Sequence, residues 1–215
     1  MTARIFNASN MTDAQLKEVA RALDNGAVAV FPTDTVYGMG CGAFCQMAVE
    51  KIYALKQRPS TQPLQLLVSG WEQAKRVAQF SAGAARLARE FWPGALTLIV
   101  PASAEGKMLL RGAKGLGLRV PAYTTLLKIL QNMENPLCAT SANLHGQAVL
   151  TEEESLENLF GAQVDFIIKG GILSPVASVV VDATDENAPR LLREGSIPRA
   201  RLEEVLSHPF VQEKV

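Results

Sequence analysis

The chain has little of the chemistry that metal sites and disulfide frameworks require. Its 215 residues include only two histidines and three cysteines, Cys41, Cys45 and Cys138. Three cysteines cannot form an even disulfide framework, and with so few histidines a zinc site is hard to assemble. We therefore predict reduced, structural thiols and no metal held by protein ligands.

The sequence also lacks long hydrophobic runs and an excess of charge of one sign. No apolar run approaches the eighteen or more residues of a membrane span, and the N-terminal stretch MTARIFN does not resemble a signal peptide. We therefore expect a cytoplasmic protein with no membrane partner. Lysine and arginine together number 21, as do aspartate and glutamate, and a net charge of zero argues against a chain that coats nucleic acid.

What remains is the composition of an ordinary globular protein, with 48% hydrophobic and 20% charged residues. A length of 215 residues suits one large domain or two small ones. The chain contains no obvious linker, internal repeat or low-complexity tract. We therefore predict one domain over residues 1–215.

Hydrophobic periodicity and capping residues predict alternating helices and strands, and hence an α/β fold. Capping boxes at Thr12–Gln15 and Ser69–Glu72 are expected to open two helices, and Ser81 a third. The expected helices lie near residues 12–25, 47–55, 71–80, 81–92, 124–133, 152–159 and 198–206. The expected strands lie near residues 27–31, 64–68, 95–100, 116–120, 136–140, 164–168, 178–181 and 190–192.

A turn rich in hydroxyl groups follows the first expected strand. Thr33, Thr35 and Tyr37 come just after Pro32, at the end of a strand where open α/β proteins often bind ligands. We expect these three side chains to line a crevice. From this segment alone, a capped turn whose threonines bond their own backbone is the favoured alternative.

Four cationic residues, Lys56, Arg58, Arg119 and Arg193, are candidates to bind an anion. Lys56 and Arg58 are two residues apart, at the point where a helix gives way to an extended segment before Pro59. This spacing can aim both at one polyphosphate, and replacing either should then cut turnover without unfolding the protein. Arg119, between apolar neighbours in a strand, needs either a ligand carboxylate or an internal acid as its partner, and Arg193 is ambiguous for the same reason.

Two further segments resemble known catalytic or nucleotide-binding motifs but do not match their patterns. Ser141 lacks the Gly-x-Ser-x-Gly pattern of a nucleophile elbow, so we interpret Thr140, Ser141 and Asn143 as hydrogen-bonding groups, with turn capping as the alternative. The glycine-rich segment Gly112–Gly117 matches neither a Walker nor a Rossmann motif and is better interpreted as a mobile loop.

Seven short motifs follow one another along the chain. They are Pro32–Gly38, Lys56–Pro59, Trp92–Thr97, Leu118–Pro121, Thr140–Asn143, Ser178–Asp182 and Leu192–Gly195. Their order resembles that of the YrdC/TsaC family, the threonylcarbamoyl-AMP synthases. The resemblance covers roughly residues 10–200. It implies a single twisted α/β domain with a mixed sheet and a large, positively charged cavity, without the second C-terminal domain expected in longer relatives.

The resemblance also implies a reaction, in which L-threonine, bicarbonate and ATP give threonylcarbamoyl-AMP and pyrophosphate for the modification of tRNA. Mg²⁺ is expected to arrive with the nucleotide, and tRNA and downstream tRNA-modification proteins are candidate partners. Lys56 and Arg58 are implied as the catalytic pair that grips the phosphates. The implied substrate and ATP contacts are Thr33, Thr35, Tyr37, Gln62, Arg119, Thr140, Ser141, Asn143, Ser178 and Arg193. Gln62 departs from the lysine or asparagine of many members.

Two alternatives stay open. One is a YciO-like paralogue that acts on another carbamoyl or nucleotide compound. The other is a module that holds double-stranded RNA or tRNA in a basic cavity, without turnover, in a chain whose segment at residues 106–133 is basic. The even net charge and the scarcity of aromatic residues in that segment speak against RNA binding, because RNA recognition commonly adds stacking surfaces to basic patches.

Overall fold

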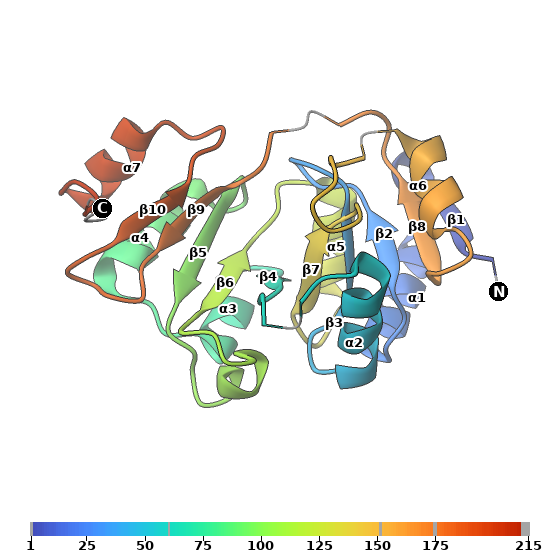
Figure 1. Cartoon of the computed structure of the whole chain (residues 1–215), viewed down its shortest axis with the longest axis horizontal. Coiled ribbons are helices and arrows are strands. Elements are labelled where there is room, and N and C mark those ends of the chain that lie inside the picture. Colours follow the sequence, from blue (N-terminus) through green and yellow to red (C-terminus); the bar gives the residue numbers. More distant parts are fainter. Residues whose placement is uncertain (1, 60, 151, 174–175, 212–215) are drawn as a thin grey trace.

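The computed structural model describes residues 2–59, 61–150, 152–173 and 176–211. These residues form a ten-stranded mixed sheet in the order β1-β8-β2-β3-β7-β4-β6-β5-β9-β10. The sheet crosses the whole molecule, from β10 at one end to β1 at the other (Figure 1). The strands are β1 (Arg4–Asn7), β2 (Ala29–Phe31), β3 (Gly38–Gly42), β4 (Gln65–Leu67), β5 (Leu96–Val100), β6 (Leu116–Arg119), β7 (Leu137–Ser141), β8 (Phe166–Lys169), β9 (Val179–Asp182) and β10 (Arg190–Arg193). The predicted α/β class with a mixed sheet is confirmed.

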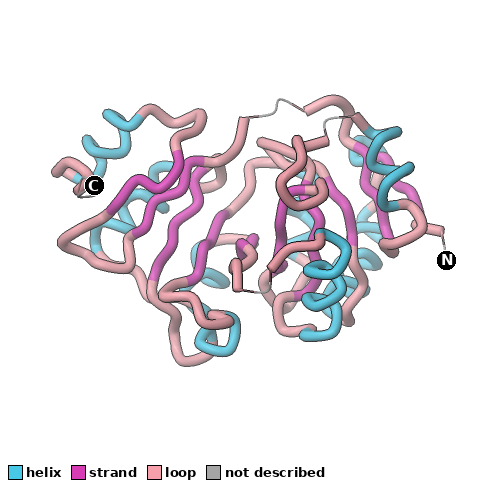
Figure 2. Tube along the Cα trace, viewed as in Figure 1, coloured by secondary structure: helices cyan, strands magenta, loops and turns pink. Residues whose placement is uncertain are grey.

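Seven α-helices and two short 3₁₀ helices are present in this part of the chain. The α-helices are α1 (Asp13–Asp24), α2 (Gln46–Lys56), α3 (Trp71–Val77), α4 (Ala82–Phe91), α5 (Thr124–Gln131), α6 (Glu153–Phe160) and α7 (Arg199–Leu206), and the 3₁₀ helices are η1 (Ala8–Asn10) and η2 (Gly106–Leu109). Figure 2 shows how they flank the strands. No helix among the described residues is long and apolar enough to cross a membrane.

Capping side chains explain where two of the seven α-helices begin, α1 and α4. The capping box at α1 forms as predicted, with reciprocal bonds between Thr12 and Gln15, and Ser81 caps α4 by accepting a hydrogen bond from the Ala84 amide. The capping box expected at Ser69–Glu72 is wrong. Gly70 occupies the N-cap of α3, so Ser69 lies outside the helix and its amide donates to the Gln73 side chain instead.

The sheet separates two apolar cores, because successive side chains of a strand point to opposite faces. On β2, Val30 packs into the core that includes residues of α2 and α6, whereas Ala29 and Phe31 pack with α1 and α5. The core of α2 and α6 continues under β5 and β9, where α3, α4 and α7 contribute to it. Among the described residues, the second core contains no side chain of β5, β6 or β9. The other face of these three strands is therefore not packed against α1 or α5.

Two strands were missed from the sequence. β1 is short and mostly exposed, and it pairs in parallel with β8 at the edge of the sheet. β3 reads as a turn because glycine occupies three of its five positions, yet every residue in it is buried. A Cβ atom on Gly40 would lie 2.6 Å from the Cys138 carbonyl oxygen. Close packing against β7 therefore requires glycine at this point of the strand.

Candidate functional site

A cavity of about 440 Å³ opens on the face of β5, β6 and β9 that points away from α3, α4 and α7. Its floor includes Thr97 and Ile99 of β5, Gly117 of β6 and Val180 of β9. Eight of the twelve predicted site residues line it: Thr33, Thr35, Arg58, Arg119, Thr140, Ser141, Ser178 and Arg193. The other four, Tyr37, Lys56, Gln62 and Asn143, are not among its lining residues. Segments far apart in the sequence therefore converge on this site.

The turn after β2 and the arginine of β6 form one polar cluster in the cavity wall. Thr35 Oγ1 accepts a hydrogen bond from Arg119 Nη1 at 2.9 Å, and it lies 2.9 Å from Thr33 Oγ1. Arg119 Nη2 lies 2.7 Å from Asp34 Oδ1. Burial lowers the pKa of Arg119, and the Asp34 carboxylate opposes that shift. The internal acid left open as a partner for Arg119 is therefore present, and the two threonines serve both as turn residues and as cavity lining.

Lys56 is buried beneath a turn formed by residues 141–143, which we call the Ser141 turn. The Lys56 ammonium donates to the carbonyl oxygens of Ser141 and Asn143, each at 2.6 Å, and to Asn143 Oδ1 at 2.8 Å. Ser141 Oγ also donates to Asn143 Oδ1 at 2.6 Å. An ammonium has three donors, and here all three meet protein oxygens. Burial, with the nearby Arg58 charge as a second cause, lowers the pKa of Lys56 to about 8.

Arg58 is oriented differently from Lys56, because Gln57 between them adopts a left-handed backbone conformation. Its Nη2 donates to the Pro63 carbonyl at 3.0 Å, and Nη1 lies 3.4 Å from Thr140 Oγ1. Its Nε is buried and has no hydrogen-bond partner among the described residues. The spacing of Lys56 and Arg58 suggested that both could point at one anion. In the structure they point to different surroundings. Of Lys56 and Arg58, only Arg58 lines the cavity.

Ser178 and Arg193 form a second cationic corner of the cavity. Arg193 donates through Nε to the Ser178 carbonyl at 2.9 Å and through Nη2 to Ser178 Oγ at 3.0 Å. The Ser178 hydroxyl also lies 2.9 Å from Thr97 Oγ1 on β5. Burial lowers the pKa of Arg193, and the positive charge of Arg119 contributes to that shift. These two arginines are therefore close enough to influence each other.

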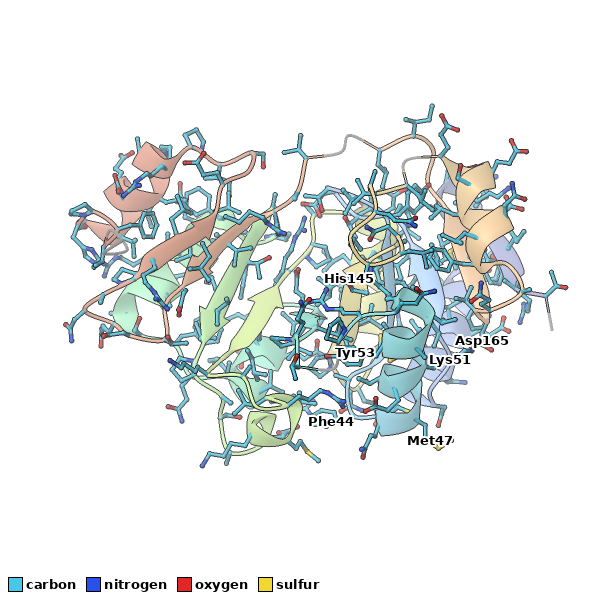
Figure 3. The ribbon with its side chains drawn as sticks, in the orientation of Figure 1. Phe44, Met47, Lys51, Tyr53, His145 and Asp165 are labelled. Atoms are coloured by element: carbon cyan, nitrogen blue, oxygen red, sulfur yellow. The ribbon has the colours of Figure 1, made fainter. Side chains whose placement is uncertain are left out.

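Tyr37 and Gln62 lie outside the cavity lining. The Tyr37 hydroxyl donates to the Gly171 carbonyl and accepts from the Gly170 amide, both at 2.8 Å, so it anchors the segment that follows β8. Burial raises the pKa of Tyr37 to about 12. Gln62 is exposed, and its carbonyl accepts a hydrogen bond from the Tyr53 hydroxyl at 2.9 Å. Figure 3 shows Tyr53 on α2, with His145 near the end of that helix.

Gln65 lines the cavity but was not singled out from the sequence. Its Nε2 is buried without a hydrogen-bond partner in the described part of the chain. One signal could have found it, because Gln65 is the only polar residue in the apolar segment LQLLV at residues 64–68. No group of three or more histidine, cysteine, aspartate or glutamate side chains among the described residues is arranged to hold a metal.

Comparison with known proteins adds to this geometry. A family model for Sua5, YciO and YrdC proteins, described as telomere recombination, matches residues 21–195. The threonylcarbamoyl-AMP synthase of Vibrio vulnificus is 34% identical over 187 residues, which cover 85% of this chain and 99% of that protein. The synthase of Pyrococcus abyssi is 34% identical over 221 residues, which cover 100% of this chain and 65% of that protein. The chain thus spans slightly less than two thirds of the second relative.

Solved structures give the same picture of the fold. The crystal structure of P. abyssi Sua5 complexed with L-threonine aligns with a TM-score of 0.89 at 32% identity, covering 98% of this chain and 63% of that one. The crystal structure of Escherichia coli YciO aligns with a TM-score of 0.82 at 27% identity, covering 91% of this chain and 97% of that one. Because both are close matches, the fold alone does not separate the two kinds of protein.

Proposed function

We propose that this chain, which belongs to the Sua5/YciO/YrdC family, is a threonylcarbamoyl-AMP synthase. It would combine L-threonine, bicarbonate and ATP into threonylcarbamoyl-AMP and pyrophosphate, and so act as a nucleotidyltransferase that supplies the modification of tRNA. The names of its relatives support this proposal, as does the L-threonine bound to P. abyssi Sua5.

The observation that carries the proposal is that three arginines line one cavity. Arg58, Arg119 and Arg193 come from three separate parts of the chain, and no acidic residue is among the described residues that line the cavity. Converging arginines are typical of sites that bind phosphates and carboxylates, because guanidinium groups match both in a bidentate manner. ATP and threonine bring both kinds of group, so a positively charged cavity would suit them.

The chemistry needs no nucleophile from the protein. The threonine amine forms a bond to the carbon of bicarbonate, whose hydroxyl group leaves with the amine proton as water. An oxygen of the resulting carbamate then attacks the α-phosphorus of ATP. A new bond from oxygen to the α-phosphorus forms, the bond from the α-phosphorus to the bridging oxygen breaks, and pyrophosphate leaves. Catalysis then rests on alignment and on neutralisation of the developing charge. Mg²⁺ that arrives with the nucleotide would neutralise part of the phosphate charge.

Each lining residue has a role that suits its contacts. Arg58 would contact the phosphates, while Thr35 and Arg119 would hold the amino acid through its carboxylate or carbamate. Thr33 would support Thr35, and Ser178 with Arg193 would complete the substrate contacts. Lys56 and Asn143 are better suited to positioning, because their polar groups already hold the Ser141 turn, which presents Thr140 and Ser141 to the cavity.

The direct test is pyrophosphate release from ATP with magnesium and bicarbonate, measured with and without L-threonine. We expect release that depends on threonine, together with an adenylate product of the mass of threonylcarbamoyl-AMP. Folded protein that binds ATP but shows no dependence on threonine would overturn the proposal in favour of a YciO-like activity. Binding of double-stranded RNA that weakens steeply as salt rises, without turnover, would favour the RNA-binding alternative.

A further inference from the structure

Gln65 combines two properties that are rarely found together in a stable fold. It lines the cavity, and its side-chain Nε2 is buried with no hydrogen-bond partner among the described residues. A buried donor left without a partner destabilises the folded state. Buried polar groups are nearly always paired, so each exception calls for a physical explanation. A ligand that accepts this hydrogen bond would supply one.

A second unpaired donor lies at the same end of β4. Arg58 Nε is also buried without a partner among the described residues. The Arg58 guanidinium bonds the carbonyl of Pro63, which is two residues before Gln65, and lies near the hydroxyl of Thr140. The Thr140 side chain points to the face of β7 opposite Gln65, because Gln65 pairs with the preceding residue, Ala139. It is the bond to Pro63 that brings the Arg58 guanidinium near the start of β4, and both Arg58 and Gln65 line the cavity.

The surroundings leave room for a ligand at this point. The strand partner of Gln65 is Ala139, and Gly117 on the neighbouring strand β6 also lines the cavity. Alanine has a small side chain and glycine has none, so neither residue fills the space beside Gln65, and a turn of the side chain would bring its covered amide donor into the cavity. A cationic donor and a neutral amide donor, both unpaired, together suit an acceptor atom that carries negative charge.

We infer that Gln65 and Arg58 bind one oxyanion of the substrate together, Gln65 through Nε2 and Arg58 through Nε. The inference deepens the proposed function and rests on it. There Arg58 is assigned to the phosphates of ATP, so the expected oxyanion is a phosphate, and the carboxylate or carbamate group of threonine is the other source that the test distinguishes. The amide adds a directional hydrogen bond without adding charge, so Gln65 helps to fix the orientation of a group that Arg58 attracts.

The test is a double-mutant cycle read out by binding. Wild type, Gln65→Met, Arg58→Ala and the double variant are titrated calorimetrically with ATP, inorganic pyrophosphate and L-threonine. Methionine keeps the length of the side chain and removes the donor, so we expect about tenfold weaker binding of one class of probe. If both donors bind one oxyanion, their effects on affinity are not independent. The loss of affinity in the double variant should therefore be about fivefold smaller than the product of the two single losses. Gln65→Glu should bind more weakly than Gln65→Met, since a carboxylate repels an anion.

Two controls separate binding from folding. Gln79→Met makes the same chemical change at an exposed position and should leave every affinity unchanged. Gln65→Met should melt at the same temperature as wild type or higher, because it removes an unpaired buried amide. A purely structural role for Gln65 predicts the reverse, with a lower melting temperature and unchanged affinities.

The probes also identify the source of the oxyanion. Weaker binding of ATP and pyrophosphate assigns it to a phosphate, and weaker binding of L-threonine assigns it to the amino acid. Unchanged affinity for all three probes, or losses that multiply fully in the double variant, would overturn the inference. Wild-type protein that binds these probes but shows no threonine-dependent pyrophosphate release would refute the proposed function and leave the binding result valid.

Discussion

Two polar regions lie close together, one at the C-terminal end of β7 and one at the start of the neighbouring strand β4. They differ in how completely their hydrogen bonds are satisfied. Beneath the Ser141 turn, the Lys56 ammonium meets three oxygens of the protein itself. At the start of β4, Arg58 and Gln65 each retain a buried donor without a partner among the described residues. The first region is complete without a ligand, whereas the second is not. A satisfied network favours a structural role, and an unsatisfied one favours binding.

The largest effect on stability is expected from Lys56→Met. This change removes three donors and leaves buried oxygens of Ser141 and Asn143 without them, which should lower the free energy of unfolding by about 3 kcal/mol. Urea denaturation measures the change. The matched control is Lys51→Met on the same helix, where Lys51 lies 3.5 Å from Asp165 and both side chains are substantially exposed (Figure 3). A loss no larger for Lys56→Met than for Lys51→Met would remove the structural role of the ammonium.

Arg58→Ala should show the opposite pattern. We expect threonine-dependent pyrophosphate release to fall by about 100-fold, because the cavity loses a guanidinium that neutralises phosphate charge. The melting temperature should stay close to that of wild type, since the side chain makes few bonds within the protein. Steady-state kinetics and a thermal melt on the same samples decide the matter. Near wild-type turnover would contradict the assignment of this region to binding.

The pH dependence of stability tests the burial of Lys56 separately. Burial lowers the pKa of Lys56 to about 8 from a usual value of 10.5, so above pH 8 the unfolded chain holds this proton more strongly than the folded one. The free energy of unfolding of wild type, measured relative to Lys56→Met, should therefore rise between pH 8 and 10.5, by at most about 1.4 kcal/mol per unit. Below pH 8 the difference should be constant. Urea melts of both proteins at pH 7, 9 and 10 test this, and a constant difference throughout would contradict it.

The smallest effect is expected at an exposed cation. Arg111 Nη2 lies 2.5 Å from Glu50 Oε1, and the guanidinium lies 5.0 Å from the centre of the Tyr53 ring. Because both charged partners reach solvent, Arg111→Ala should lower the free energy of unfolding by less than about 1 kcal/mol. A urea melt at low and high salt measures this loss. A larger loss that persists in high salt would contradict this prediction, because Arg111 would then contribute to the free energy of unfolding as a buried cation such as Lys56 does.

Much of the fold could be predicted from local pattern. The first capping box and the capping serine at residue 81 place the starts of α1 and α4, because caps depend on residues three positions apart. β3 could not be found this way. Its glycines read as a turn, and their reason lies in distant contacts with Cys138 and with the Leu23 carbonyl, which only the packed structure supplies. Ser69 failed as a cap because the adjacent Gly70 took that position.

The candidate site likewise has features that follow from local sequence and features that depend on distant contacts. The sequence by itself determined which residue types were available, including the hydroxyl-rich turn, Arg58, Arg119 and the Ser141 turn, because their motifs are local. Only the tertiary structure decided their use. It buried Lys56 under oxygens of the chain, turned Tyr37 toward Gly170 and Gly171, and placed Gln65 on the cavity floor. The physical reason is that a hydrogen bond depends on which distant atoms come within reach, and strand register and the direction of the backbone at Gln57 decide that.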